Sequence, residues 1–136
     1  MHEDRAIKYE VFDYVKNVPF QIIIIRNKDY ENMDYSKFLP HWHSELELAF
    51  VKSSSIHYID GVKVEANSGD LVITNSMSIH KITLPCINYE IPEEIAAIVI
   101  IIHLDWIKNL FPEYGRYVFT NDNKQVSPDI LKVIDI

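Results

Sequence analysis

Two runs of β-branched residues dominate the hydrophobic pattern of the chain. Residues 20–26 read FQIIIIR and residues 98–104 read IVIIIHL, so each run is apolar on both faces over the length of one strand. Strands of this composition are usually buried on both sides. We therefore expect two central strands with both faces covered.

Five shorter strand-like segments lie between these two runs. They cover residues 45–51, 56–59, 62–66, 70–75 and 79–84. Asp60-Gly61 predicts a tight hairpin and Asn67-Ser68-Gly69 a second turn, because Asp, Asn and Gly tolerate positive φ angles. Many short strands joined by turns predict a mostly β protein, either a sandwich or a small barrel.

The C-terminal third has a helical pattern instead. Asp105 is suited to cap a short helix over residues 106–111, which Pro112 would end. Ser127-Pro128 predicts the start of a second helix. Its apolar side would carry Ile130, Leu131 and Ile134. Either this helix continues beyond Ile136, or it is a C-terminal tail that packs on the domain. We divide the chain into a β-barrel over residues 1–104 and the start of a helical segment over residues 105–136.

Length and charge narrow the classes of function. A chain of 136 residues forms one domain, and its net charge of −7 makes it a poor nucleic-acid binder because phosphate binding relies on Lys and Arg. The single cysteine, Cys86, excludes an intramolecular disulfide. The longest apolar run, residues 95–102, is far shorter than the about 20 residues that cross a bilayer. We expect a cytoplasmic protein without a membrane partner.

The chemically informative segment is residues 41–47, HWHSELE. On one extended strand His41, His43, Glu45 and Glu47 would share a face, because side chains alternate between faces. A His-x-His pair followed four residues later by Glu has the spacing of metal ligands, and suits iron, nickel, manganese or zinc. Such pairs also occur as ordinary surface histidines. A later segment, GDLVITNSMSIH, adds His80.

Together, HWHSELE and GDLVITNSMSIH resemble the two consecutive motifs of the cupin superfamily. The first motif supplies two His and one Glu and the second one more His, which here match His41, His43, Glu47 and His80. From about Phe20 to its end the chain is similar to the N-terminal sensor domain of AraC-family transcription regulators. In that family an HxHxxxE strand, a hairpin and a GDL…H strand precede a segment such as IIIHLDWIKNLFPEYG.

This resemblance implies a cupin-like double-stranded β-helix (jelly-roll) barrel followed by C-terminal α-helices. It implies a small-molecule effector in the barrel pocket, for which a polar molecule such as a sugar is the family analogy. It also implies a homodimer through the C-terminal helices, with DNA contacted only by a domain outside this chain. The four matching residues would hold a divalent metal (Zn, Ni, Fe or Mn); the alternative is a polar pocket that binds a ligand or water without metal.

Other residues are weaker candidates for ligand binding. Glu45 is expected to be solvated or at the edge of the pocket. His57 and Tyr58 follow a turn, and one of them can face the pocket. No residue is assigned a catalytic role, and Cys86 has no activating partner nearby in the sequence.

Two departures from the family pattern bear on function. Lys52-Ser53-Ser54-Ser55 stands where the family has a glycine, and Asn75-Ser76-Met77 precedes His80 where the family has Pro and Gly. Three functions remain open: a regulatory sensor, a small metal-dependent cupin enzyme of the dioxygenase or isomerase type, and a stand-alone binding module. In the enzyme, the general base would be Glu45, or Glu47 if Glu47 does not bind the metal. The departures and the unfinished apolar helix favour the sensor.

Overall fold

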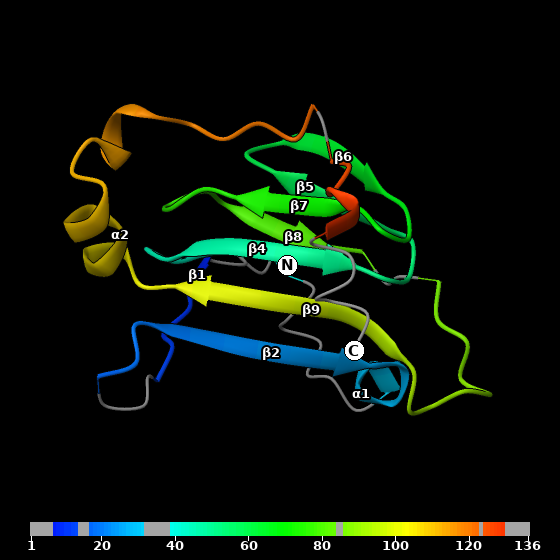
Figure 1. Cartoon of the computed structure of the whole chain (residues 1–136). Coiled ribbons are helices and arrows are strands. Elements are labelled where there is room, and N and C mark those ends of the chain that lie inside the picture. The colour runs from blue at the N-terminus through cyan, green and yellow to red at the C-terminus, as the bar shows by residue number, and fades with distance from the viewer. Residues whose placement is uncertain (1–6, 14–16, 32–38, 84–85, 123, 130–136) are drawn as a thin grey trace, which may run out of the picture.

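Two β-sheets packed face to face make up most of the protein. The computed structural model describes residues 7–13, 17–31, 39–83, 86–122 and 124–129 (Figure 1). One sheet has the strand order β1 (Lys8–Tyr9), β3 (His41–Trp42), β8 (His80–Ile82), β5 (Ser55–Ile59) and β6 (Val62–Ala66). The other has the order β2 (Phe20–Arg26), β9 (Ile95–Ile102), β4 (Leu46–Val51) and β7 (Leu71–Thr74). The strand pairs are antiparallel except for β1 and β3, which are parallel.

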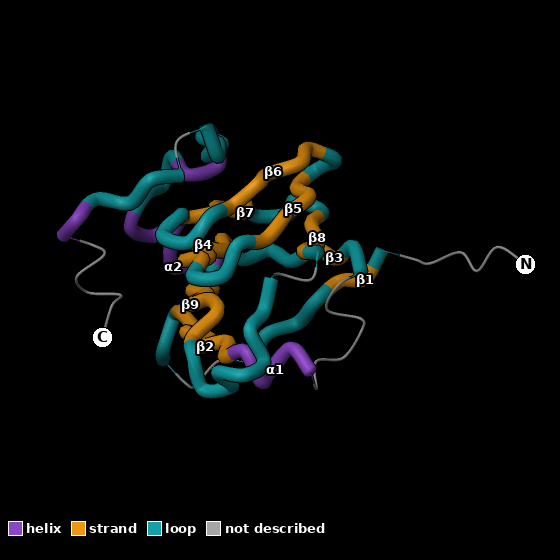
Figure 2. The backbone as a smooth tube through the Cα atoms, turned by 90° about the vertical axis from the view of Figure 1, so that its right-hand side faces the viewer, coloured by secondary structure: helices purple, strands orange, loops and turns teal. Residues whose placement is uncertain are grey.

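The chain passes repeatedly from one sheet to the other. From β3 onward it alternates between them, with only the β5–β6 hairpin staying within one sheet. Figure 2 shows the sheets converging at β6 and β7 and diverging towards β1 and β2. The short helix α1 (Asn27–Glu31) lies on the diverging side. The predicted mostly β fold is confirmed as a two-sheet sandwich, and this wrapping is consistent with a cupin-like architecture.

Both predicted turns are present. Asp60 and Gly61 have φ angles of 49° and 80° and join β5 to β6 as a tight hairpin. Gly69 has a φ of 94° in the turn that carries the chain from β6 to β7 in the other sheet.

The β2 strand corrects the expectation that both isoleucine-rich runs are covered on both faces. Ile23 and Ile25 point between the sheets, but Ile22 and Ile24 on the other face are 55% and 49% exposed. Within the described part of the chain, β2 pairs only with β9 and so lies at the edge of its sheet. A two-layer sandwich buries one face of each sheet, so a continuous apolar run can still have an open face.

The C-terminal elements differ in detail from the prediction. The strand predicted to reach residue 104 ends at Ile102, and α2 (Leu104–Leu110) follows. His103 is the N-cap, because its Nδ1 accepts a hydrogen bond of 3.1 Å from the backbone N–H of Asp105, so the assignment of Asp105 as the cap was wrong.

A 3₁₀ turn, η2 (Tyr114–Arg116), comes next, and helical backbone begins again at Pro128. The helices are thus a minor part of the described protein. The predicted apolar helix side at Ile130, Leu131 and Ile134 lies outside the described residues.

The hydrophobic core lies between the sheets. Its most buried members include Val72 on β7 and Ile101 on β9, each 1% exposed. Smaller side chains at Ala49 and Ala66 complete the packing. Among the described helices, none combines the length and the apolar character that crossing a membrane requires.

Candidate metal centre

The segment HWHSELE bends between the two sheets instead of forming one strand. His41 belongs to β3, His43 and Glu45 lie in the bend, and Glu47 belongs to β4 in the other sheet. The expectation that these four residues share one face of a strand was therefore wrong. The functional residues converge because the chain crosses the gap between the sheets.

Three histidines come together at this bend. His41 on β3 is paired directly with His80 on β8, and their ring centroids are 4.3 Å apart. His43 lies 4.8 Å from His80 by the same measure and is 1% exposed. The backbone N–H of Met77 donates a 2.8 Å hydrogen bond to the carbonyl of His43, which ties the loop before β8 to the bend. One ring nitrogen from each histidine lies within 4.8 Å of the others.

The backbone orients all three rings in the same way. Each Nδ1 lies against a carbonyl oxygen: that of Leu39 at 2.8 Å for His41, that of Glu45 at 3.1 Å for His43, and that of Ser78 at 2.9 Å for His80. A carbonyl oxygen only accepts, so each Nδ1 carries a proton and donates it. In a neutral ring the lone pair is then on Nε2. This is the orientation that ligating histidines adopt in metal sites.

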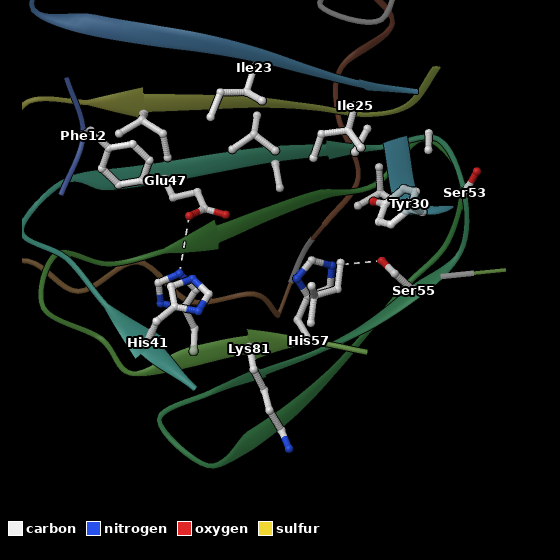
Figure 3. Close-up of a pocket in the computed structure, with 18 residues that line it drawn as sticks. Phe12, Ile23, Ile25, Tyr30, His41, Glu47, Ser53, Ser55, His57 and Lys81 are labelled. Atoms are coloured by element: carbon white, nitrogen blue, oxygen red, sulfur yellow. Dashed lines mark hydrogen bonds and ion pairs between the residues drawn. The ribbon is translucent and has the colours of Figure 1, made fainter. Parts of the chain in front are cut away.

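The Nε2 atoms face carboxylates. Glu47 reaches from the opposite sheet and places Oε2 3.1 Å from His43 Nε2 and 3.4 Å from His80 Nε2. Figure 3 shows the Glu47 carboxylate above His41. His41 Nε2 lies 3.3 Å from Oε2 of Glu10, in the segment after β1. Carboxylate oxygens and imidazole lone pairs repel each other, so this geometry requires a cation between them, either protons or a metal ion.

The electrostatics of the cluster are dominated by Glu47. Burial alone would raise its pKa, but the hydrogen bonds and charges of His43 and His80 outweigh burial and hold the Glu47 pKa well below its usual range. Burial alone would lower the pKa of His80, but Glu47 outweighs that effect and raises it. For His41 the pKa is lowered, because burial and the charge of His80 together outweigh the Leu39 carbonyl, Glu10 and Glu47.

The donor set fits a divalent transition metal. Three imidazole nitrogens and one carboxylate are the ligands that zinc, nickel, iron and manganese accept in proteins. His41, His43 and His80 would supply Nε2, and Glu47 would supply Oε2. The carbonyl partners of the three Nδ1 atoms would fix the ring orientations around the ion.

Glu45 is not the solvated residue that the sequence suggested. It is 6% exposed, and its Oε2 lies 3.8 Å from Nδ1 of His43. Its backbone carbonyl, rather than its carboxylate, orients the His43 ring. It does not appear among the residues that line the neighbouring cavity. Its buried Oε2 has no hydrogen-bond partner among the described residues.

A cavity of about 200 Å³ adjoins the histidine cluster. His41, His80 and Glu47 line one end of it. Most of its wall is apolar and comes from the inner faces of β2, β4 and β9. The apolar lining residues are Phe12, Ile23, Ile25, Ala49, Val51, Ile82, Ala96, Ala97, Val99 and Ile101.

The other end of the cavity is polar but neutral. His57 Nε2 is hydrogen-bonded to Ser55 Oγ at 2.9 Å, and burial lowers the His57 pKa (Figure 3). Burial also raises the pKa of Tyr30, on α1, to about 12. Tyr58 follows His57 on β5 but is not among the lining residues; its ring packs under the Lys81 ammonium at 5.1 Å. Of the two candidates on β5, the structure brings only His57 to the cavity.

Sequence reasoning missed Glu10, Phe12, Tyr30 and Ser55. Phe12 lines the cavity and meets the His43 ring edge-on at 5.2 Å between centroids. Glu10 and Phe12 belong to a short N-terminal segment without a motif, and they reach the site because β1 pairs with β3. Ser55 could have been found from alternation, since it shares a face of β5 with His57.

No protein-family model matches the chain, and none of the curated proteins matches it. Among solved structures, the EutQ protein of Clostridium difficile is 25% identical over 46% of this chain, with a TM-score of 0.34. The match spans 45% of EutQ, less than half of its length. The plu4264 protein from Photorhabdus luminescens is 20% identical over 69% of this chain and 74% of its own, with a TM-score of 0.36.

Proposed function

We propose that this protein is a metal-binding sensor domain of an AraC-like transcription regulator. In this proposal His41, His43, His80 and Glu47 hold a divalent metal, and a small-molecule effector enters the adjoining cavity. The C-terminal helices form a homodimer, and a domain outside this chain contacts DNA. The order and spacing of the two sequence motifs support the regulator, and the histidine cluster supports the metal.

One observation carries the metal site. One ring nitrogen from each histidine lies within 4.8 Å of the others, and Glu47 Oε2 lies 3.1 Å and 3.4 Å from Nε2 of His43 and His80. Every Nδ1 is held by a backbone carbonyl. Apart from this cluster, the described residues contain no comparable group of three ligating side chains. A bound ion would offer a Lewis-acid position at the histidine end of the cavity. The protein itself would orient the ligands, exclude bulk water and surround the effector with apolar side chains.

The sensor role requires that the effector change an equilibrium. A ligand shifts a conformational equilibrium only if it binds one arrangement better than the other. The cavity lies between two sheets and is lined by β2, β4 and β9, with α2 directly following β9. Occupancy of the cavity can therefore be transmitted through β9 to the C-terminal helices.

Metal content tests the site directly. Protein prepared without a histidine tag is dialysed against zinc or nickel, and bound metal is measured in wild type and in the H41A/H43A variant. We expect about one ion per chain in the wild type and none in the variant. His57→Gln is the matched control, because His57 lines the same cavity but lies outside the cluster. Equal metal content in all three proteins would contradict the site.

The coding sequence beyond Ile136 tests the regulator. We expect it to continue into two helical segments rich in Lys and Arg, which supply the basic surface that this chain lacks. A stop codon directly after Ile136 would contradict the sensor proposal and leave the metal site standing.

A metallocupin enzyme is the second candidate function. The observation in its favour is that the histidine cluster opens on an apolar cavity large enough for a small substrate. Metal-loaded protein that consumes oxygen or isomerises a small molecule that it binds, with loss of turnover in H41A/H43A, would favour the enzyme over the sensor.

A further inference from the structure

The walls of the cavity define the chemistry of its ligand. We propose that the cavity takes a compact, mostly apolar molecule with a single oxygen-bearing head group at the histidine end. Its apolar part has the size of one substituted aromatic ring or a short branched acyl chain. The head-group position rests on the proposed metal site, whereas the apolar part rests on the cavity walls alone.

The apolar wall is continuous between the two polar ends. Ile23 and Ile25 project from β2, and Val99 and Ile101 project from β9. Figure 3 shows Ile23 and Ile25 on the side of the cavity opposite His41 and His57. A ligand that spans the cavity therefore has one long side against branched aliphatic side chains.

This wall does not suit the sugar that the family resemblance suggested. A buried hydroxyl without a hydrogen-bond partner loses its hydrogen bonds to water and weakens binding. A sugar has hydroxyls around its whole ring, and those facing Ile23, Ile25, Val99 and Ile101 would have no partner there. An apolar body gains free energy from the same contacts.

The size of the cavity limits the ligand to a small one. An engineered apolar cavity of about 150 Å³ holds one benzene molecule. The cavity of about 200 Å³ therefore accommodates one ring with a small substituent. The cavity is partly open to solvent, so a fused ring system or a long acyl chain would extend out of it and lose contact with its walls.

The two ends differ in what they can bind. Ser55, His57 and Tyr30 offer neutral polar groups at one end, and the Lys81 ammonium points away from the cavity towards Tyr58 (Figure 3). Among the described lining residues, no cation faces this end, so a second charged group on the ligand would be unpaired there. At the other end, the metal proposed between His41, His80 and Glu47 would accept an oxygen donor. Glu10, which contacts His41, adds negative charge beside that end. Because this charge opposes an anionic head group while a metal favours it, the probes below include one charged and one neutral head group.

Three probes test the proposal by calorimetry on the full chain, each with and without zinc. They are benzyl alcohol, benzoate and L-arabinose. We expect both aromatic probes to bind, with zinc strengthening the binding of at least one of them, and arabinose not to bind. Tighter binding of arabinose than of either aromatic probe, or no binding of either aromatic probe, would overturn the proposal.

Two neighbouring residues of β2 provide matched variants. Ile23→Phe fills the cavity and should weaken binding of the aromatic probes at least about tenfold, whereas Ile24→Phe changes the exposed face and should leave binding within about twofold. Ala97→Leu fills the cavity from β9 and replaces Ile23→Phe if that variant does not fold, as judged by circular dichroism. Equal affinity in the filling variant and in Ile24→Phe would place the probes elsewhere and overturn the proposal.

The same titrations separate this proposal from the metal site. If zinc does not bind but benzyl alcohol does, and the filling variant weakens it, the metal assignment fails and the apolar cavity is supported. If zinc binds as expected and neither aromatic probe does, the ligand proposal fails and the metal site stands.

Discussion

His80 and His57 lie on adjacent strands of one sheet and line the same cavity, yet their environments shift their pKa values in opposite directions. Both are buried, and burial by itself would lower the pKa of each. At His80 the Glu47 carboxylate at 3.4 Å outweighs burial and raises the pKa. At His57 the direct partner is the neutral Ser55 hydroxyl, and burial prevails. The comparison shows that a carboxylate from the opposite sheet decides which end of the cavity carries charge.

The largest expected effect concerns metal-induced stability. A metal that binds only the folded protein stabilises it by about 4 kcal/mol when its concentration is 1,000 times its Kd. We expect zinc to raise the melting temperature of wild type and of His57→Ala, and not that of His80→Ala. Thermal unfolding with and without zinc measures this difference. If zinc raised the melting temperature of both variants equally, His80 would not be needed for zinc binding and the predicted difference between the two ends would be contradicted.

A smaller effect is expected from removing the charge of Glu47 in metal-free protein. Glu47→Gln replaces charged interactions with His43 and His80 by neutral ones, and hydrogen bonds to charged groups contribute about 1.5–3 kcal/mol. We expect the free energy of unfolding in urea at pH 6 to fall by about that amount. A variant as stable as wild type would mean that Glu47 contributes no net charge interaction.

The pH dependence of stability should have opposite signs at the two ends. The lowered pKa of His57 stabilises the metal-free protein above about pH 6.5, and this contribution is lost as the pH falls through the folded-state value. The raised pKa of His80 stabilises it below about pH 6.5, and that contribution is lost as the pH rises through the folded-state value.

Urea unfolding between pH 5 and 8 measures both contributions. Relative to wild type, His57→Gln should lose stability least at low pH, and His80→Gln should lose it most there. Parallel curves for the two variants would contradict the assignment of one charged and one neutral end.

The smallest effect is expected at the neutral end. Ser55→Ala removes one hydrogen bond to His57, and neutral hydrogen bonds contribute about 0.5–1.5 kcal/mol. Metal affinity should stay unchanged, because Ser55 does not touch the cluster. Urea unfolding and a zinc titration of the same variant check both statements. A loss of zinc binding would show that the Ser55–His57 end affects the metal site and would contradict the prediction.

The sequence predicted the elements that local patterns control. Alternation and turn residues located β4 to β8 to within one or two residues, because Asp60-Gly61 and Gly69 adopt the positive φ angles that the turns require. The metal-ligand spacing also drew attention to the residues that converge in the structure. For the strands and turns, local alternation and turn residues are enough to locate the elements.

The rest depends on contacts that sequence spacing does not encode. The bend at His43 to Glu45 moves Glu47 into the other sheet, although the alternation there is that of one continuous strand. Glu10 reaches His41 only through the pairing of β1 with β3. The exposure of Ile22 and Ile24 follows from the uncovered outer face of the two-layer sandwich, which an isoleucine run does not reveal.

The central claim is that three imidazoles and one carboxylate hold a divalent metal at one end of the cavity. X-ray absorption spectroscopy of the zinc-loaded protein tests it most directly. We expect three imidazole nitrogens and at least one carboxylate oxygen around zinc, at the usual distances of about 2.0–2.2 Å. A spectrum with one imidazole or none around the ion would contradict it.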